Sequence, residues 1–167
     1  DKENDEILEK TKLNKIITRS QNNRFAMYDD KIGEGQFKRV FRGYDYDSGK
    51  EIAWNVITLV DLTDAEVENL EKEISLLKKI KHERILNYIY GWFDDEKNEV
   101  ILITELFTGG SLKQYLQTIE FPRIRAIKQW IIDILSGLKY LHDMNIIHRD
   151  IKCDNIFINK NDGHIKI

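Results

Sequence analysis

The sequence is poor in the features that would indicate an extracellular, membrane-spanning or nucleic-acid-binding protein. Cys153 is the only cysteine among 167 residues, so no disulfide can form within the chain, which fits a reducing compartment. No apolar run approaches membrane-spanning length, and the opening D-K-E-N-D-E lacks the apolar core of a signal peptide. A net charge of −3 gives no polyelectrolyte signal for nucleic acid or an anionic membrane. We therefore expect a cytoplasmic protein with no nucleic-acid partner and no membrane insertion.

The composition suits a packed core with a solvated surface, since 41% of the residues are hydrophobic and 33% are charged. Residues 1–24 are polar and charge-rich, and we expect them to form a flank outside the core. Residues 25–60 alternate β-rich runs with Gly, Asp and Ser, a pattern typical of an antiparallel meander. The strands expected in the first part of the chain are 25–32, 37–44, 51–59, 85–93 and 99–106.

A helix is predicted between the third and fourth of these strands. Thr63 and Glu66 fit a capping box at its start. The apolar residues that follow at helical spacing are Val67, Leu70, Ile74 and Leu77. Glu73 lies at the border of this apolar stripe.

Helices dominate the part of the chain after residue 106. Ser111 can cap a short helix over 112–117, and a long helix is predicted from about Pro122. An apolar stripe at spacings of three and four predicts its buried face, formed by Ile124, Ile127, Ile131, Ile134, Leu138 and Leu141. Short strands are expected over 156–158 and 164–167.

Five strands with one helix, followed by a helical part, form an α+β two-lobe pattern. We expect three regions along the chain: the flank over 1–24, a β-rich part over 25–106, and a helical part over 107–167.

The strongest chemical signal is H-R-D-I-K-C-D-N at residues 148–155. Asp150 lies five residues before Asn155 and directly after His-Arg. This arrangement places a hydroxyl-orienting carboxylate and a metal-binding amide in one loop. A polar loop after a helix is the plain alternative, but chance rarely produces H-R-D-x-K-x-x-N directly after a long helix.

Three other features are weak in isolation. Gly33-x-Gly35 could bring backbone N–H groups close to phosphates, but an isolated G-x-G is more often an ordinary turn. A helical glutamate such as Glu73 is most often solvated. The connector T-E-L-F-T-G-G-S at 104–111 could present its backbone to a purine edge, or could simply link the two parts.

The histidines and tryptophans carry no further chemical signal. His82, His142 and His164 have no companions at metal-ligand spacing, and we expect structural roles for them. Trp130 lies just beside the apolar stripe of the long helix and is expected to be a packing residue.

The order of these features resembles the eukaryotic protein kinase family from about residue 25 onward: glycine loop, strand, helix with a glutamate, connector and H-R-D loop. More narrowly, four stretches resemble the with-no-lysine serine/threonine kinases: G-E-G-Q-F-K, E-I-A-W-N, T-E-L-F-T-G-G-S-L-K-Q-Y-L and I-I-H-R-D-I-K-C-D-N-I-F-I. The resemblance implies a protein-kinase-like fold, with the N-lobe over 25–106 and the hinge and part of the C-lobe over 107–167. In that subfamily a lysine on strand two replaces the usual lysine of strand three.

Strand parity supports such a relocated lysine here. Side chains alternate between faces along a strand, so Lys38 points to the same face as Val40, which matches the valine that packs over adenine. On the next strand Asn55 shares a face with Ala53, which matches the adenine-packing alanine. Lys38 could therefore occupy the phosphate space that the short, neutral Asn55 cannot serve, with Glu73 as its partner. The subfamily usually has cysteine at the position of Asn55. The alternative is a pseudokinase, in which Asn55 marks a dead site and Lys38 is a surface residue.

The resemblance also implies roles for the other site residues. Asp150 would orient the substrate hydroxyl and accept its proton, Lys152 would steady the transferring phosphate, and Asn155 would bind Mg²⁺. The residues that would surround ATP are Gly33 and Gly35 at the phosphates, and Ile32, Val40, Ala53, Thr104 (as gatekeeper), Glu105, Phe107 and Phe157 at the adenine. The activity implied is transfer of the ATP γ-phosphate to a serine or threonine hydroxyl of a protein substrate.

The sequence ends at H-I-K-I, before the metal-binding D-F-G or D-L-G segment that the resemblance leads us to expect. We expect a fragment that is inactive by itself and poorly soluble, with apolar surface exposed on its helical part. The alternatives are a half-kinase that acts as a scaffold and a nucleotide-binding sensor without transfer activity.

Overall fold

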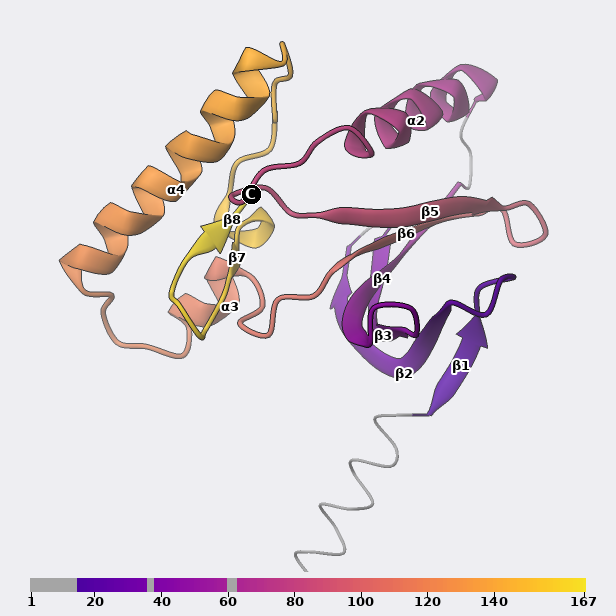
Figure 1. Cartoon of the computed structure of the whole chain (residues 1–167), viewed down its shortest axis with the longest axis horizontal. Coiled ribbons are helices and arrows are strands. Elements are labelled where there is room, and N and C mark those ends of the chain that lie inside the picture. The colour runs from indigo at the N-terminus through magenta and orange to yellow at the C-terminus, as the bar shows by residue number, and fades with distance from the viewer. Residues whose placement is uncertain (1–14, 36–37, 60–62) are drawn as a thin grey trace, which may run out of the picture. The chain divides into compact units, whose positions relative to one another are not determined.

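The computed structural model describes residues 15–35, 38–59 and 63–167 (Figure 1). The chain forms two compact units. Unit 1 contains the described residues up to Lys79 together with Tyr88–Leu106, and unit 2 contains Ile80–Asn87 together with Phe107–Ile167. Residues 80–87, which the sequence analysis places in the β-rich part, thus group with the helical part.

Unit 1 is built on one antiparallel sheet of six strands in the order β1-β2-β3-β4-β6-β5. The strands are β1 (Ile16–Arg19), β2 (Phe25–Glu34), β3 (Lys38–Asp45), β4 (Lys50–Thr58), β5 (Tyr88–Asp94) and β6 (Glu99–Glu105). The sequence predicts five of them. Strand β1 is the addition, and it lies in the flank 1–24 that was expected outside the core. Its four residues are too few to show a recognisable alternation of apolar and polar side chains.

The two faces of this sheet carry different clusters, because side chains alternate along each strand. Trp54 and Val56 of β4 belong to a buried cluster on one face, whose members are Phe25, Ile52, Trp54, Val56, Ile101 and Ile103. Ile57 faces the other way, where the buried cluster contains Leu59, Ile74, Tyr88 and Val100. Ile74 belongs to helix α2, so the helix covers this second face.

Helix α2 (Asp64–Leu77) begins with the predicted capping box. The Thr63 N–H donates to Glu66 Oε2 at 2.7 Å, and the Glu66 N–H donates to Thr63 Oγ1 at 3.4 Å. The bond from the Thr63 N–H also lowers the pKa of Glu66 below its ordinary value. The box satisfies backbone groups that have no partner within the helix and fixes where α2 begins.

Asp45, at the end of β3, is a buried carboxylate of unit 1, with 1% of its side chain exposed. The Arg24 guanidinium donates to both of its oxygens, each at 2.9 Å. Ser48 Oγ donates to the same carboxylate at 2.8 Å and the Asp47 N–H at 3.1 Å. The Arg24 bonds above all outweigh the cost of burial and lower the pKa of Asp45 to about 2. The carboxylate thus joins the turn before β2 to the turn after β3.

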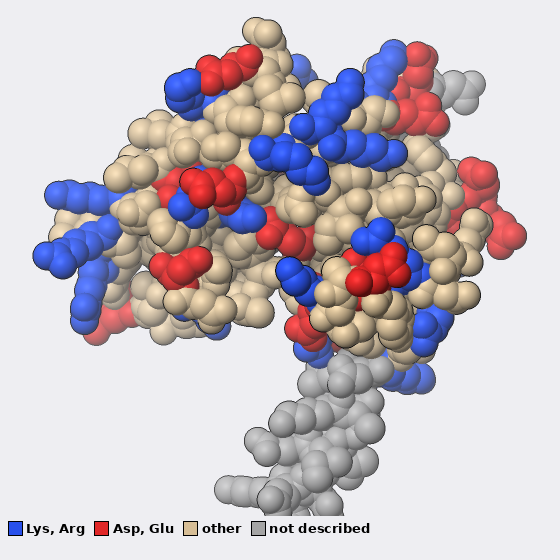
Figure 2. Space-filling model, in the orientation of Figure 1, with Lys and Arg blue, Asp and Glu red and all other residues tan. Residues whose placement is uncertain are grey.

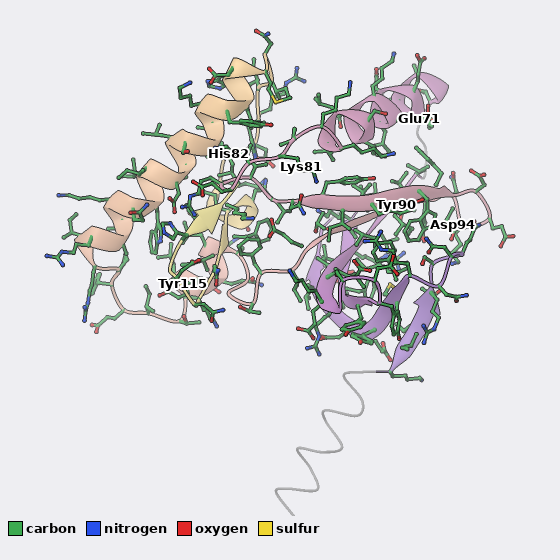
Figure 3. The ribbon with its side chains drawn as sticks, viewed as in Figure 1. Glu71, Lys81, His82, Tyr90, Asp94 and Tyr115 are labelled. Atoms are coloured by element: carbon green, nitrogen blue, oxygen red, sulfur yellow. The ribbon has the colours of Figure 1, made fainter. Side chains whose placement is uncertain are left out.

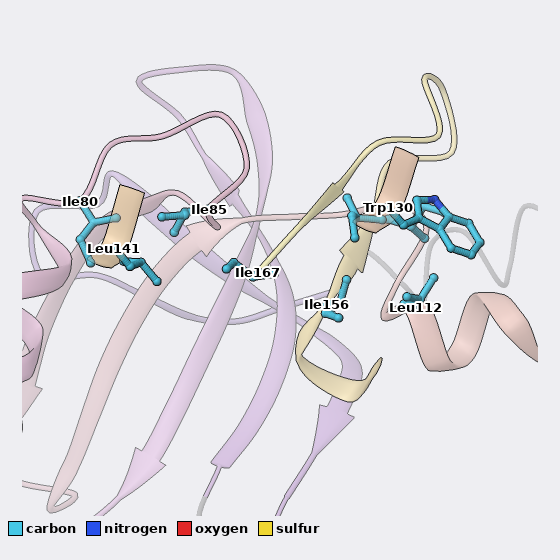
Figure 4. Close-up of a cluster of buried hydrophobic side chains, with 9 residues drawn as sticks. Ile80, Ile85, Leu112, Trp130, Leu141, Ile156 and Ile167 are labelled. Atoms are coloured by element: carbon cyan, nitrogen blue, oxygen red, sulfur yellow. The ribbon is translucent and has the colours of Figure 1, made fainter. Parts of the chain in front are cut away.

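Unit 2 combines two helices with a small two-stranded sheet. Its elements are α3 (Leu112–Leu116), α4 (Ile124–Asp143), the 3-10 helix η1 (Cys153–Asn155), β7 (Phe157–Ile158) and β8 (Ile165–Lys166). Ser111 caps α3 as predicted, since its Oγ accepts the Gln114 N–H at 3.2 Å. The core, most of it labelled in Figure 4, consists of Ile80, Ile85, Leu112, Trp130, Leu141, Ile156, Ile158, Ile165 and Ile167.

Asp133 of α4 is a buried carboxylate of unit 2, with 2% of the residue exposed. It accepts hydrogen bonds from Gln129 Nε2 at 2.9 Å and from the Ile165 N–H at 3.1 Å. His164 Nδ1 lies 2.9 Å and Arg84 Nε 3.2 Å from its oxygens. Burial alone would raise the pKa of Asp133, but these partners hold it below its ordinary value. The carboxylate therefore ties α4 to β8 and to the segment that contains Arg84.

The apolar stripe predicted for α4 is only partly correct. The stripe residues that contact the core are Ile127, Ile134, Leu138 and Leu141. Ile124 and Ile131 are instead 65% and 51% exposed. The fully buried positions of the helix are Trp130, Asp133, Gly137 and Leu141. Spacing alone cannot reveal that a paired carboxylate and a glycine take inward positions, and this is why the predicted face is rotated from the observed one.

The surface of unit 2 carries exposed apolar side chains, as expected for the helical part. The most exposed besides Ile124 are Phe121, Ile132, Leu135 and Ile147. Acidic and basic side chains are interspersed over the face shown in Figure 2. In the ranges that the structure describes, no helix combines the length and apolar character needed to cross a membrane.

Asp45→Asn tests the buried ion pair of unit 1. The pKa of Asp45 is about 2 in the folded chain against an ordinary 3.8, so its ionised form contributes about 2 kcal/mol to the free energy of unfolding. We expect Asp45→Asn to lose about that amount at pH 7 in urea denaturation followed by tryptophan fluorescence. The contribution is complete above the ordinary pKa and is lost as pH falls toward the folded-state value, so the two stabilities should converge there.

Asp47→Asn is the matched control in the same turn. Asp47 Oδ2 lies 3.2 Å from Arg24 Nε, but its side chain is 67% exposed, so we expect a loss of at most about 1 kcal/mol. Equal losses in the free energy of unfolding of the two variants at pH 7 would show that the burial of Asp45 does not increase the contribution of its ion pair to stability.

Candidate functional site

The H-R-D loop of unit 2 brings three of the predicted site residues together. Lys152 Nζ lies 2.9 Å from Asp150 Oδ2. Asn155 Nδ2 donates to the same oxygen at 2.6 Å and to the Asp150 carbonyl oxygen at 3.1 Å. Asn155 ends the short helix η1, which turns the chain so that a residue five positions later reaches back to Asp150. The loop therefore holds a carboxylate, an ammonium and an amide within direct contact.

The Asp150 carboxylate is exposed and is kept ionised by its neighbours. The Lys152 hydrogen bond is the main cause that lowers the pKa of Asp150 below its ordinary value, and the Asn155 amide adds to it. An ionised, accessible carboxylate can accept a hydrogen bond from a hydroxyl group and then take its proton.

The residues just before Asp150 shape the loop. His148 Nδ1 accepts the Asp150 N–H at 3.3 Å, and burial lowers the pKa of His148, so a neutral imidazole is favoured there. Arg149 has a φ of 67°, a left-handed conformation that is uncommon for a residue other than glycine. Such a conformation costs of order 1 kcal/mol, and strain of this kind gathers at functional sites.

The Asn155 amide fits the role of a magnesium ligand. Both of its observed hydrogen bonds use Nδ2, which leaves Oδ1, the hard donor that Mg²⁺ prefers. No group of three or more His, Cys, Asp or Glu residues that could hold a metal ion occurs in the described residues. The described loop thus offers one amide oxygen toward a magnesium ion, with Asp150 beside it.

Two residues beside this loop escaped the sequence analysis. Lys113 Nζ of α3 lies 2.8 Å from Asp154 Oδ1, next to Asn155. The bond raises the pKa of Lys113 and lowers the pKa of Asp154. The two residues are 41 positions apart, so no local pattern could have indicated the contact. The pair attaches α3 to the H-R-D loop.

Unit 2 also brings together two of the residues predicted to surround adenine. The rings of Phe107 and Phe157 lie with their centroids 6.2 Å apart. Lys166 Nζ lies 5.5 Å from the Phe107 ring centroid. The two rings offer a partly buried apolar surface.

Unit 1 carries the remaining predicted residues, and the register of β3 with β4 decides which of them share a face. Val40 is paired with Asn55, and Lys38 with Ile57. Directly paired side chains lie on the same face of a sheet, so Lys38, Val40, Ala53 and Asn55 all face one way. This agrees with the parity argument made from the sequence. Ala53 is paired in turn with Thr104 on β6.

The expected ion pair between Lys38 and Glu73 is not formed. Both side chains are exposed, and no ion pair of either is found in the described ranges. Partial desolvation of its ammonium group lowers the pKa of Lys38. The structure therefore places the lysine on the face that the sequence predicts, but without the carboxylate.

Asn55 is buried and bonded to the backbone rather than available to a ligand. Its Nδ2 donates to the Leu102 carbonyl at 3.0 Å and the Ala53 carbonyl at 3.2 Å, and lies 3.3 Å from Thr104 Oγ1. The residue at the position of the expected lysine thus links β4 to β6 by hydrogen bonds.

The two glycines of the candidate phosphate loop are not required by the packing of unit 1. A Cβ atom added at Gly33 would meet Val40 at 3.5 Å, and one at Gly35 would meet the Lys38 carbonyl at 3.7 Å, both ordinary contacts. Neither glycine has a positive φ. The Gly35 N–H donates to the Lys38 carbonyl at 2.7 Å, which closes the β2–β3 connection. Among the described residues, side-chain contacts would therefore not by themselves exclude a larger residue at either position.

The last predicted residues lie where strands end or bend. Ile32 of β2 is 38% exposed. Glu105, the last residue of β6, is paired with Ile52 and partly buried. These placements leave their proposed contacts with adenine as predictions.

Lys152→Met tests the electrostatics of the loop. Because the Lys152 hydrogen bond is the main cause of the lowered pKa of Asp150, its removal should move that pKa upward toward the ordinary value. The pKa can be followed by carboxyl ¹³C NMR of the chain labelled at aspartate. Lys113→Met is the control, since it should raise the pKa of Asp154 and leave that of Asp150 in place. An unchanged Asp150 pKa in Lys152→Met would contradict the contact.

Comparisons with known proteins agree with the arrangement of this loop and sheet. The family model described as protein kinase domain matches residues 27–167. The chain is 45% identical over 148 residues to serine/threonine-protein kinase WNK8 of Arabidopsis thaliana. It is also 45% identical over 149 residues to probable serine/threonine-protein kinase WNK9 of Oryza sativa subsp. japonica. Each match covers 86% of this chain but only 26% and 36% of the two relatives.

A solved structure is similar as well. The crystal structure of Rad53 1-466 in complex with AMP-PNP matches with a TM-score of 0.77 and 26% identity, over 87% of this chain and 38% of that one. The family model extends over most of the chain and includes most of β2, strands β3 to β6 of unit 1 and the H-R-D loop of unit 2. The chain therefore belongs to the protein kinase family, in which it is similar to the WNK serine/threonine kinases.

Proposed function

We propose that the protein to which this chain belongs transfers the γ-phosphate of ATP to a serine or threonine hydroxyl of a protein substrate. The observation that carries the proposal is the contact of Asp150 with both Lys152 and Asn155 in one loop. A plain polar loop gives no reason for an ionised carboxylate to share one oxygen with an ammonium and an amide. Phosphoryl transfer needs these groups, because its catalysis is mainly positioning and charge stabilisation.

Each group of the loop has one task in this proposal. The Asp150 carboxylate accepts a hydrogen bond from the substrate hydroxyl, orients it for attack, and takes its proton. Lys152 places a positive charge beside that carboxylate, where it can also neutralise oxygens of the transferring phosphate. Asn155 would hold Mg²⁺ through Oδ1, and the ion would neutralise phosphate charge when bound.

The residues proposed to contact ATP belong to unit 1, apart from two aromatic rings of unit 2. Gly33 and Gly35 have no side chain, which would let phosphates approach the backbone closely. Val40 and Ala53 offer apolar contact on the face that also carries Lys38. Phe107 and Phe157 offer further apolar surface for a purine. AMP-PNP, an ATP analogue, is the ligand named for the similar Rad53 structure.

Lys38 supplies the positive charge that the usual strand-three lysine supplies in other kinases. Its position on the same face as Asn55 and Ala53 supports this role. A pseudokinase that binds nucleotide or acts as a scaffold is the second candidate. It is favoured by Glu73, which is exposed and has no ion pair with any other described residue. We also propose a cytoplasmic location, on the basis of the single cysteine and of ATP as cosubstrate.

Lys38→Met separates the two candidates when made in the full-length protein. Loss of one charge that stabilises the transition state should lower kcat by about 10²–10³-fold, measured as ³²P transfer from labelled ATP to a peptide library. Arg39→Met is the control, since Arg39 is the next residue of β3 and faces the other way, paired with Glu99 at 2.6 Å. Equal activity of wild type and Lys38→Met would refute the relocated lysine.

Asp150→Asn tests the role of the carboxylate itself. The amide cannot accept the hydroxyl proton, so we expect transfer to fall by at least about 10²-fold. Nucleotide affinity, measured by calorimetry with AMP-PNP and Mg²⁺, should change little. Full activity of this variant would refute the role of Asp150, and no transfer by wild type while AMP-PNP still binds would favour the pseudokinase.

A further inference from the structure

A hollow of about 390 Å³ lies on one face of the unit 1 sheet. Its floor includes Trp54 and Val56, which alternate along β4 with Asn55 and Ile57. It therefore opens on the face opposite to α2 and Lys38. We call it the outer groove. Its floor consists of Met27, Trp54, Val56, Trp92 and Ile101, and its rim includes Thr18 and Arg19 of β1, residues 94–97 and Glu99. The proposed phosphotransfer makes no use of it.

The floor of the outer groove is apolar and aromatic. Trp54 and Ile101 are nearly fully buried, whereas Met27 and Trp92 are partly exposed. The rings of Trp54 and Trp92 meet edge to face with centroids 5.2 Å apart. This packing holds the Trp92 indole in a fixed orientation. An indole is the best partner for a flat cation such as guanidinium, and a thioether suits an aliphatic chain.

The rim of the outer groove is acidic. Its charged residues are Asp94, Asp95, Glu96 and Glu99 against Arg19 and Lys97. Two of the carboxylates are already matched, since Lys97 Nζ lies 3.2 Å from Asp94 and Arg39 lies 2.6 Å from Glu99. In the described part of the chain Asp95 and Glu96, both exposed, have no ion pair. They form the turn that follows Asp94 at the hairpin end of β5 (Figure 3). Two unmatched carboxylates beside an apolar floor favour a cationic ligand.

Both ends of the sheet border the outer groove. Strands β1 and β5 are the first and last of the sheet order in the described residues, and the groove is lined from β1 on one side and from the β5–β6 hairpin on the other. The outer backbone groups of an edge strand are available to an added strand. An extended segment can therefore use main-chain hydrogen bonds for affinity and alternate side chains for specificity.

We infer that the outer groove binds an extended segment of a partner protein that carries arginine side chains on one face. The aliphatic part of an arginine would lie along Met27, its guanidinium would stack on Trp92, and its charge would face Asp95 and Glu96. Arginine fits better than lysine because its planar group stacks on indole and is weakly hydrated. This docking site is independent of the proposed phosphotransfer, since it lies on the other face of the sheet.

A pair of matched peptides tests the inference. The probe is the fluorescein-labelled peptide T-V-R-V-R-V-T-S, in which the two arginines lie on one face when the peptide is extended. Its partner has both arginines replaced by citrulline, which has nearly the same shape without the charge. We expect saturable binding of the arginine peptide to the full-length protein by fluorescence anisotropy, and at least about tenfold weaker binding of the citrulline peptide. Binding should also weaken as salt is raised.

Charge-reversing variants locate the binding. Glu96→Lys should weaken the arginine peptide by about tenfold, and Asp95→Lys by a similar factor. Both side chains are exposed in a turn, so we expect the circular dichroism spectra to be unchanged. Glu71→Lys is the control: Glu71 is exposed on α2, on the other face of the sheet, and the substitution changes the net charge equally. Glu71→Lys should leave the affinity for the arginine peptide unchanged.

Four outcomes would overturn the inference. They are equal binding of the citrulline peptide, equal weakening by Glu71→Lys, absence of saturable binding, and self-association of the protein that Glu96→Lys abolishes. The last would assign the groove to a second copy of the chain. Loss of kinase activity in any of these variants has no bearing on the result, so failure of the docking site and failure of the proposed function are distinguishable.

Discussion

A carboxylate removed from water must be matched by hydrogen-bond donors and positive charge, and this requirement organises both units. In unit 1 the donors around Asp45 come from the turns before β2 and after β3, so the matching fixes where two strands begin and end. In unit 2 the donors around Asp133 come from α4, from β8 and from Arg84. Segments distant in the sequence are thereby held in a defined register at points where apolar packing alone would allow sliding.

The alternation of side chains along β3 and β4 imposes a second constraint. One face of the sheet takes Lys38 and Ala53 together with the cluster under α2, and the other takes Trp54 and Val56. A chemical site and an apolar groove can therefore coexist on two strands without competing for residues. Because each strand residue can serve only one face, changes in the groove leave the lysine face intact, which makes the two proposed activities separable by mutation.

Features set by neighbouring residues could be predicted from the sequence, and features set by distant partners could not. The capping box of Thr63 with Glu66 and the cap at Ser111 were predicted correctly, because each depends only on a few consecutive residues. The sequence also placed Asp150 and Asn155 in one loop, where the structure brings them into contact. The role of Asp133 was not predicted, since its partners Arg84 and His164 lie far from it in the sequence. Strand β1 was missed because its four residues show no recognisable alternation. The exposure of Ile124 was missed because spacing alone does not show which helix positions are buried, and the expected ion pair of Lys38 with Glu73 is not formed in the described residues.

The placement of the lysine has a structural consequence beyond its charge. Since Lys38 and Asn55 share a face, the fold allows the positive charge on either strand. A lysine at the buried position of Asn55 would need a partner for its charge. Asn55 instead bonds the carbonyls of Ala53 and Leu102 from a buried position and links β4 to β6. With the charge on β3, the centre of the sheet can hold a neutral side chain whose amide nitrogen bonds to both β4 and β6.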